Sequence, residues 1–433
     1  MSAGVEVGDD MRPRDAAGRV TLTNVLVAGS LMRGAAFAAG GAGIGFAAAT
    51  GMLAGRLAAA PEGRQEVDAP SRVARAIPRA GMEGCIGCEA CASVCPVLEQ
   101  STIEGPWYPG PRSVGNLGRS GPTADVSAES LSLCTLCGAC STVCPAGGRN
   151  QELVVALRAD IVARRPDTVP DAWRVVPRVL AEAGNVYGTS LAPMEGPRRA
   201  DAEIAFFPGC TLQYFERESG ARTIRLLESF GVPLSIVDGV CCGGPLDVLG
   251  LEPGADAVER NREAVRATGA SVVVAACPRC AHMLSRQLGL DGVCIEHALE
   301  TVARLLPGSR VLETLRVKLG GRSVTYHDPC EIGRYLGRYL EARTIMRMVG
   351  LLVVEMERSM ERSQCCGAGG GLRSVNPKLS REISRRRVSE AMDTGASSLL
   401  TECPSCLHNL RTGRRRKQSI VVEDLTAFLG EAV

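Results

Sequence analysis

Lysine, aromatic residues and histidine are scarce in this 433-residue chain. Only Lys318, Lys378 and Lys417 occur among 49 basic residues, aromatic residues make up 3%, and there are four histidines. The net charge of +2 gives no electrostatic case for nucleic-acid binding, so no nucleic-acid partner is expected. No GxGxxG motif follows an expected strand, so the chain should bind no flavin or nicotinamide. The 45% hydrophobic and 22% charged residues exclude a mainly disordered or collagen-like chain.

Cysteine, by contrast, is abundant, with 19 residues. In a chain long enough for roughly two to four domains, so many cysteines indicate either disulfides of a secreted protein or metal ligands of an intracellular one. Their close, repeated spacing favours metal ligands. Because thiolate-bound metal clusters are damaged by oxidation, we expect a cytoplasmic protein.

The N-terminal extension, residues 1–78, contains an uncharged segment rich in Ala and Gly at 34–55, between Arg33 and Arg56. A segment of this length can span a bilayer. Ala and Gly are only weakly favoured in hydrocarbon, so a helix docked on a partner and a loosely ordered tail remain alternatives. A cleaved secretory signal is not expected, because the segment starts late and lacks a compact basic leader.

Two cysteine runs follow the extension, and each has the spacing C-x2-C-x2-C-x3-C-P. This spacing is typical of two-cluster ferredoxins, in which three cysteines bind one 4Fe-4S cubane and the fourth binds the other. Structural zinc and disulfides are weaker alternatives, because zinc sites use paired C-x2-C knuckles instead. The spacing predicts Cys85, Cys88, Cys91 and Cys144 as ligands of cubane 1, and Cys134, Cys137, Cys140 and Cys95 as ligands of cubane 2.

The C-terminal part of the chain is an internal repeat in which apolar runs lead into cysteines, with corresponding cysteines about 120 to 126 residues apart. Helical stretches alternate with these runs, which indicates parallel α/β units whose cysteines gather at the carboxyl ends of the strands. The expected helices cover 217–230, 254–268, 338–349 and 378–394. The expected regions are a ferredoxin-like α-helical domain (79–165), a proline-rich linker (166–200), and two α/β cysteine-rich domains (201–310 and 318–433).

Each repeat carries five cysteines, which are more than a cubane needs. The adjacent Cys-Cys pair cannot simply clamp one small ion, so the pattern indicates a larger or opened iron–sulfur cluster, with buried zinc as the alternative. The predicted ligands are Cys210, Cys241, Cys242, Cys277 and Cys280 in the first repeat, and Cys330, Cys365, Cys366, Cys403 and Cys406 in the second.

Together, the ferredoxin-type runs and the duplicated CCG motif resemble the D-type subunit of heterodisulfide reductase. The sequence is also similar to the iron–sulfur subunits of anaerobic glycerol-3-phosphate dehydrogenase and glycolate oxidase. The similarity covers about 80–433 and is closest at Val324-Thr-Tyr-His-Asp-Pro-Cys330, Cys365-Cys-Gly-Ala-Gly-Gly-Gly371 and Glu402-Cys-Pro-Ser-Cys406. The family often has His after Asp-Pro-Cys, where this chain has Glu331. Tyr108-Pro-Gly-Pro-Arg112 resembles the glycerol-phosphate subunit instead.

The resemblance implies a non-cubane 4Fe-4S cluster on each five-cysteine set and two cubanes that supply its electrons. It implies reduction of a disulfide, of the coenzyme M–coenzyme B type, between the two facing clusters. The electron donor would be a membrane cytochrome b or a flavoprotein, and the chain would associate with the cytoplasmic face of the membrane in anaerobic metabolism. The alternative is an electron-transfer subunit of a flavin-dependent glycerol-3-phosphate, glycolate or lactate dehydrogenase that feeds quinone.

A few further residues have two interpretations each. His327 either donates a proton to a leaving thiolate, as a catalytic residue, or orients the cluster loop. The glycines at 367–371 fit close backbone approach to a cluster better than a phosphate loop, because no GK[ST] follows. Arg279, Arg334 and Arg373 are candidates for pairing with an anionic substrate, although any one of 46 arginines is more often a surface charge.

Overall fold

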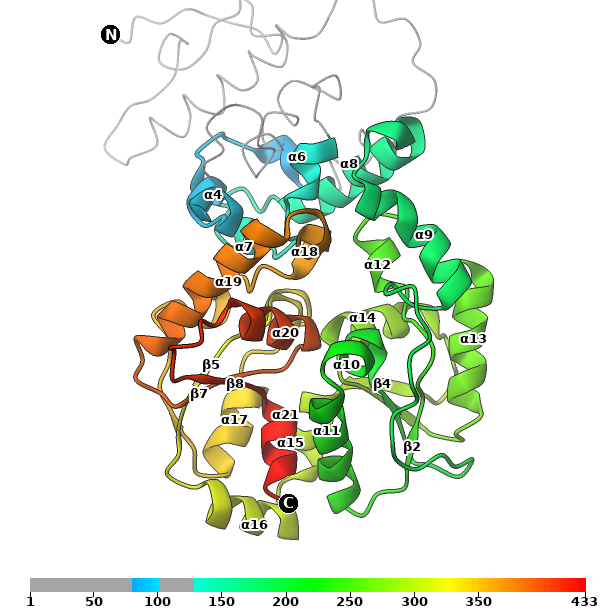
Figure 1. The fold of residues 1–433 in the computed structure, drawn as a ribbon, viewed down its shortest axis with the longest axis vertical. Coiled ribbons are helices and arrows are strands. Elements are labelled where there is room, and N and C mark those ends of the chain that lie inside the picture. The colour runs from blue at the N-terminus through cyan, green and yellow to red at the C-terminus, as the bar shows by residue number, and fades with distance from the viewer. Residues whose placement is uncertain (1–79, 101–127) are drawn as a thin grey trace, which may run out of the picture.

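The computed structural model describes residues 80–100 and 128–433 (Figure 1). Two α/β halves lie side by side, and a small helical module covers one end of both. The extension 1–78, its segment 34–55 and the stretch from Tyr108 to Arg112 lie outside the described residues. Among the residues that are described, no helix is long and apolar enough to cross a membrane.

The first half contains a four-stranded parallel sheet in the order β2-β1-β3-β4. Phe206 on the central strand β1 pairs with Ile236 on β2 and with Val274 on β3, and all three side chains are buried. Such continuously apolar strands are expected where helices cover both faces of a parallel sheet. The elements are β1 Ile204–Phe207, α10 Gly209–Phe215, α11 Arg217–Ser229, β2 Leu234–Ile236, α12 Gly244–Asp247, α13 Ala255–Arg266, β3 Val272–Ala275, α14 Pro278–Gln287, β4 Cys294–His297, α15 Ala298–Leu305 and α16 Arg310–Leu319.

The second half repeats this topology, with the order β6-β5-β7-β8. The duplicated parallel α/β fold expected from the repeat is therefore confirmed, and the four expected helices are present as α11, α13, α17 and α19. The elements are β5 Ser323–Tyr326, the π-helix η4 Glu331–Tyr335, α17 Glu341–Met348, β6 Leu352–Val353, η5 Met360–Arg362, η6 Gly369–Gly371, α18 Leu372–Val375, α19 Pro377–Met392, β7 Ser398–Thr401, α20 Pro404–Gly413, β8 Val421–Asp424 and α21 Leu425–Glu431.

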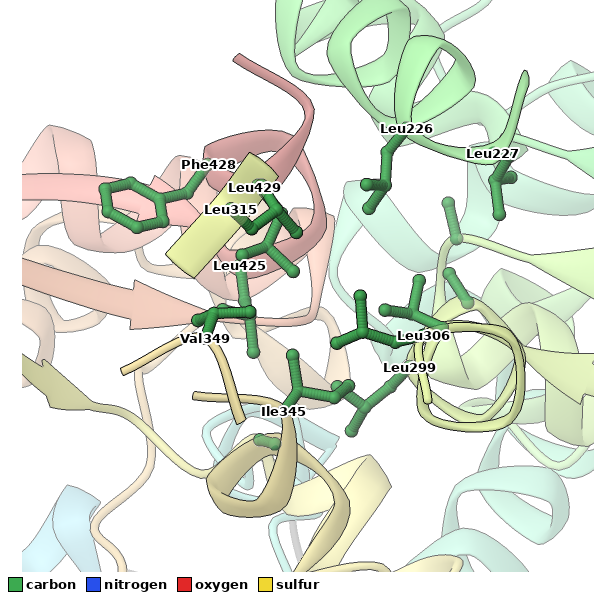
Figure 2. Packing of buried hydrophobic residues seen from close by; sticks show 14 of the residues in the cluster. Leu226, Leu227, Leu299, Leu306, Leu315, Ile345, Val349, Leu425, Phe428 and Leu429 are labelled. Atoms are coloured by element: carbon green, nitrogen blue, oxygen red, sulfur yellow. The ribbon is translucent and has the colours of Figure 1, made fainter. Parts of the chain in front are cut away.

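The two halves share one hydrophobic core, in which α11 packs against α21 (Figure 2). Leu226 and Leu227 of α11 and Leu425 and Leu429 of α21 are at most 1% exposed. Gly430 allows the helices to approach, because a Cβ atom there would lie 2.0 Å from the Arg222 carbonyl oxygen. Burial of these leucines, at about 1.5–3 kcal/mol each, fixes the halves in one relative position.

The N-terminal module consists of short helices within and beside the two cysteine runs, followed by the two longer helices α8 and α9. The guanidinium of the fully buried Arg158 donates to the carbonyls of Leu131 and Cys134 in the module, at 2.8 and 2.7 Å. It also donates to Val248 of the first half and Gly370 of the second, at 2.9 and 2.8 Å. One side chain thus joins all three parts. The elements are η2 Met82–Gly84, α3 Ala90–Ser93, α4 Pro96–Gln100, α6 Ala128–Ser132, α7 Ala139–Thr142, α8 Asn150–Arg164, η3 Pro166–Thr168 and α9 Asp171–Ala183.

Candidate metal centres

The four cysteines predicted to bind cubane 2 line one cavity in the N-terminal module. Cys134, Cys137 and Cys140 come from the loop before α7 and from α7 itself, and Cys95 comes from the other cysteine run. Asn150 completes the lining, and its buried Oδ1 has no hydrogen-bond partner among the described residues. Burial raises the pKa of Cys95 to about 12, and the thiols of Cys137 and Cys134 add to the rise. Two of the four cysteines are buried and two are half-buried, and the thiols disfavour each other's ionisation. Such a set suits a metal cluster, which would stabilise all four thiolates.

The cysteines predicted to bind cubane 1 also gather in one place. Cys85, Cys88 and Cys144 all lie close enough to Cys91 to raise its pKa, with burial as the main cause. The Gly148 amide donates to the Cys144 sulfur at 3.2 Å. The set is the more exposed of the two, because the Cys88 side chain faces solvent.

Both cysteine loops contain residues in the left-handed region of the backbone. Gly87 and Glu89 have φ values of 71° and 60°, and the corresponding Leu136 and Gly138 have values of 53° and 73°. Such angles are unfavourable for Glu and Leu, so the loops are strained turns that wind the backbone tightly around the sulfurs. The Leu136 amide accordingly donates to the Cys134 sulfur at 3.4 Å.

In the first half, the five motif cysteines form a continuous group of thiols. Cys210 contacts Cys241, the adjacent Cys242 lies 3.3 Å from Cys280 between sulfurs, and Cys280 contacts Cys277. Cys210 and Cys277 follow the carboxyl ends of β1 and β3, as expected for a ligand site on a parallel sheet.

The second half arranges its five cysteines in the same way. Cys330 contacts Cys365, whose neighbour Cys366 contacts Cys406, which in turn contacts Cys403. The amides of Gly367 and Ala368 donate to the sulfurs of Cys365 and Cys366 at 3.3 and 3.4 Å. In the first half, the Gly243 amide donates to the Cys241 sulfur at 3.4 Å. Each half therefore presents an all-sulfur donor set with amide donors beside it, which suits an iron–sulfur cluster.

Two contacts connect these groups of cysteines. Cys277 of the first half contacts Cys403 of the second. Cys137 of the N-terminal module contacts Cys365, and this contact, with burial, raises the pKa of Cys137 well above its usual value. The cysteines predicted to bind cubane 2 therefore adjoin the second-half set, which adjoins the first-half set.

His327 lies with Cys366 and Cys406, and their potential ligand atoms are all within 4.8 Å of one another. The Arg387 Nε–H donates to His327 Nδ1 at 3.1 Å, so the proton of the neutral ring is on Nε2. Burial lowers the pKa of His327 to about 3, and the charge of Arg387 adds to this. His327 is therefore neutral near pH 7, and what it offers is a hydrogen bond from Nε2 rather than the proton of an imidazolium.

The glycine-rich loop after Cys366 packs against the N-terminal module. A Cβ atom on Gly369 would lie 2.4 Å from the Thr135 carbonyl oxygen, and one on Gly370 would lie 2.1 Å from that of Cys134. The glycines thus permit close backbone approach to the loop that carries the predicted cubane 2 ligands. This agrees with close packing rather than phosphate binding.

Arg279, Arg334 and Arg373 are all partly or largely buried, although most arginines of such a chain are expected at the surface. Arg279 pairs with Asp247 at 2.7 Å and with Glu331, and Arg334 donates to the carbonyl of Cys137 at 3.2 Å. Arg158 and Arg387 are completely buried, and neither was among the residues predicted from the sequence. Arg158 lies among Val154, Leu157 and Ile161 on the buried face of α8, and this apolar spacing is the signal by which the sequence could have identified it.

Comparison with known proteins identifies both parts of the chain. Residues 81–148 match the 4Fe-4S dicluster domain, and residues 204–285 and 324–411 each match the cysteine-rich CCG domain. The first of three similar proteins is the D-type subunit of a heterodisulfide reductase of Methanosarcina barkeri, which is named for dihydromethanophenazine and CoB–CoM. It is 30% identical to this chain over 69% of this chain and 77% of its own length. The B-type subunit of a CoM/CoB fumarate reductase of Methanothermobacter marburgensis is 31% identical over 75% of this chain and 66% of its own. An EtfAB:quinone oxidoreductase of Syntrophomonas wolfei is 25% identical over 71% of this chain and 47% of its own.

Proposed function

Because the chain belongs to the family of D-type heterodisulfide reductase subunits, an iron–sulfur electron-transfer family, we propose that it reduces a disulfide at its paired cysteine-rich halves. Electrons would enter at the N-terminal module and leave at the junction of the two halves. The observation that carries this proposal is the pair of contacts Cys137–Cys365 and Cys277–Cys403. They give electrons a short route from the predicted cubane 2 site to both five-cysteine sets.

The proposed reaction is R–S–S–R′ + 2 e⁻ + 2 H⁺ → R–SH + R′–SH. The S–S bond breaks, both sulfurs are reduced, a partner supplies the electrons and solvent supplies the protons. When bound, an iron–sulfur cluster transfers one electron at a time and offers iron to a sulfur ligand. Two facing sites therefore match the two-electron requirement of a disulfide, which gives a reason for the duplication.

The chain's own residues would hold and orient the reacting groups. The ten repeat cysteines would hold two non-cubane 4Fe-4S clusters, and the eight N-terminal cysteines two cubanes. His327 would donate a hydrogen bond from Nε2 beside Cys366 and Cys406, and Arg387 would keep that ring in the required tautomer. This role orients a sulfur and needs no imidazolium.

This function requires a partner that supplies electrons, because the chain has no flavin or nicotinamide motif of its own. Relatives are named as subunits of reductases, which supports a multi-subunit assembly. We propose a cytochrome b or a flavoprotein as the electron donor, at the cytoplasmic face of the membrane. The more exposed cysteine set around Cys88 is the entry point that this arrangement favours.

The second candidate is an electron-transfer subunit that passes electrons between a flavoprotein and quinone. The relative named EtfAB:quinone oxidoreductase favours it. In that case the paired halves would relay electrons and would not turn over a disulfide. A flavoprotein that transfers electrons to this chain, without any disulfide reduction, is the result that this candidate requires.

The test starts from protein purified without air. Four clusters require about sixteen irons per chain, whereas two cubanes alone require about eight. Reduced viologen and a panel of disulfides then test turnover, and electron paramagnetic resonance of the oxidised protein with added thiol tests whether a site binds sulfur. Cys365→Ser should lower the iron content and abolish turnover, whereas Cys294→Ser, which changes an exposed cysteine outside the motifs, should do neither. Full iron content without turnover of any disulfide would overturn the proposal.

A further inference from the structure

The duplication creates two rims where the halves meet, each built from the same positions of the repeat. Position 5 after the first motif cysteine is Phe215 in one half and Tyr335 in the other. A leucine follows each CCG motif a few residues later, and the next residue is Asp247 in one half and Arg373 in the other. The first rim contains Asp247 and Tyr335, and the second contains Phe215 and Arg373.

Ion pairs close the first rim. Arg279 binds Asp247 at 2.7 Å and also binds Glu331, and its guanidinium lies 5.6 Å from the centroid of the Tyr335 ring. Arg286 adds a third ion pair, to Asp247 at 3.2 Å. Every charge on this rim is thus matched by a neighbour within the chain.

The second rim carries an arginine that has no carboxylate partner among the described residues. The Arg373 guanidinium lies 5.4 Å from the centroid of the Phe215 ring and interacts with the Tyr187 hydroxyl. Its Nη1 is nevertheless buried with no hydrogen-bond partner in the described part of the chain. The nearby carboxylate of Glu216 is already bound by Arg411 and lies 3.4 Å from His408. A buried guanidinium N–H without an acceptor is rare in folded proteins, and an anionic ligand would satisfy it.

Aromatic side chains surround this arginine and remain partly exposed. Tyr214 and Phe215 are 45% and 40% exposed, although both are large and apolar. Phe215 stacks on His408 with ring centroids 3.9 Å apart, and Tyr214 stacks on Tyr187 at 4.4 Å. The rim therefore offers a rigid apolar surface beside a cation.

The second rim also lies near a predicted cluster ligand of each half. Arg373 is near enough to Cys366 for its charge to favour the thiolate. On the other side, the Tyr187 hydroxyl lies 2.9 Å from that of Thr211, the neighbour of Cys210. Burial raises the pKa of Tyr187 to about 12, and Cys210 adds to this. A ligand held here would reach the sulfur sites of both halves.

We propose that this rim, centred on Arg373, is the specificity site of the reaction and binds an anionic end of the disulfide substrate. A carboxylate, sulfonate or phosphate would accept hydrogen bonds from the Arg373 guanidinium. The carbon chain between that anion and the S–S bond would lie on Phe215 and Tyr214. The inference rests on the proposed disulfide chemistry and adds the residues that would recognise an acidic end of the substrate, with Arg373 as the side chain that determines specificity.

The test measures binding to the iron-loaded protein in its oxidised state, without an electron donor, by titration calorimetry. The probes are dithiodipropionate, its uncharged dimethyl ester, and bis(sulfopropyl) disulfide, which distinguishes sulfonate from carboxylate. We expect the wild-type protein to bind an acidic probe at least about tenfold more tightly than the ester. Arg373→Gln should remove this preference, and Arg373→Lys should retain part of it.

Arg286→Gln is the matched control, because it removes a half-exposed arginine from the closed rim and should leave the preference unchanged. Equal iron content in all variants excludes loss of a cluster as the cause. No preference in the wild-type protein, or the same preference in Arg373→Gln, would overturn the inference. Turnover of neutral disulfides with no charge preference would overturn this inference alone, whereas an Arg373-dependent preference without any turnover would overturn the proposed function alone.

Discussion

Arg279 of the first half and Glu331 of the second form a largely buried ion pair beside the predicted ligands Cys280 and Cys330. At the position of Glu331, the family often has histidine. The Glu331 carboxylate Oε2 is buried without a hydrogen-bond partner among the described residues, so Arg279 is its principal compensation. The pair therefore links the halves at the point where their predicted metal sites approach each other.

Glu331→Gln should destabilise the protein by about 3 kcal/mol, because Arg279 would keep a buried charge with only Asp247 to compensate it. Denaturant unfolding under anaerobic conditions measures this change. Glu313→Gln provides the control, since Glu313 pairs with Arg316 at the surface and should contribute less than about 1 kcal/mol. Equal effects of the two substitutions would show that the Arg279–Glu331 pair is not a significant link.

The sequence predicted three strands of each sheet, because each of these strands is a short apolar run that leads toward a motif cysteine. The fourth strands, β4 and β8, end at His297 and Asp424 with no cysteine close after them, so this signal did not mark them. The sequence could not predict the partner of Arg279, because Glu331 lies 52 positions away and the contact exists only after the halves have packed. The prolines of residues 166–200 indicated a linker. Helix α9 nevertheless forms there with Pro177 inside it, and Trp173 of α9 packs under Arg158, whose guanidinium lies 4.9 Å from the ring centroid. Tertiary packing outweighs the hydrogen bond that a proline removes.

Gly370→Ala tests the contact between the glycine-rich loop and the N-terminal module. The substitution places a methyl group 2.1 Å from the Cys134 carbonyl oxygen, at a φ of +59°. We expect a loss of about 3 kcal/mol or more in unfolding free energy, from strain and from separation of the two parts.

Gly308→Ala is a close control, because Gly308 has a φ of +71° but open space around its Cα. It should cost only about 1 kcal/mol, from the backbone angle. The difference between the two variants isolates the steric contact. If Gly370→Ala lowered the unfolding free energy no more than Gly308→Ala does, close packing against the cysteine loop would not be the reason for a glycine at position 370.

Because His297 is buried, the stability of the protein should depend on pH. Burial lowers the pKa of His297 from 6.5 to about 4, so the folded protein holds it neutral. Above pH 6.5 the residue is neutral in both states. As the pH falls from 6.5 toward 4, only the unfolded state gains the proton, so His297 should cost up to about 1.4 kcal/mol of stability per pH unit.

His297→Asn isolates this effect, because His297 caps α15 by accepting from the Leu299 amide and asparagine can also cap a helix. The corresponding residue of the second half, Asp424, caps α21 in the same way. Unfolding free energies of both proteins, measured between pH 4 and pH 7, should differ by an amount that changes with pH. A difference that stays constant over this range would contradict the assigned pKa.

Arg158 should determine whether the N-terminal module stays docked. Its guanidinium donates to four carbonyl groups, and only one of them, that of Val248, belongs to the first half. Arg158→Met leaves these buried acceptors without a donor, at a cost of about 3 kcal/mol or more. Arg158→Lys should recover only part of this, because an ammonium cannot reproduce the planar fork.

Hydrogen exchange separates docking from global unfolding. In Arg158→Met, the amides of α6 and α8 should exchange faster, while those of β1 and β5 stay protected by their own sheets. Arg164→Met, on the exposed side of the same helix, should leave both sets unchanged. Faster exchange throughout the chain would mean that Arg158 supports the whole fold. Unchanged exchange in α6 and α8 would mean that the apolar contacts of α8 suffice, and that the arginine does not hold the predicted cubane 2 site against the second half.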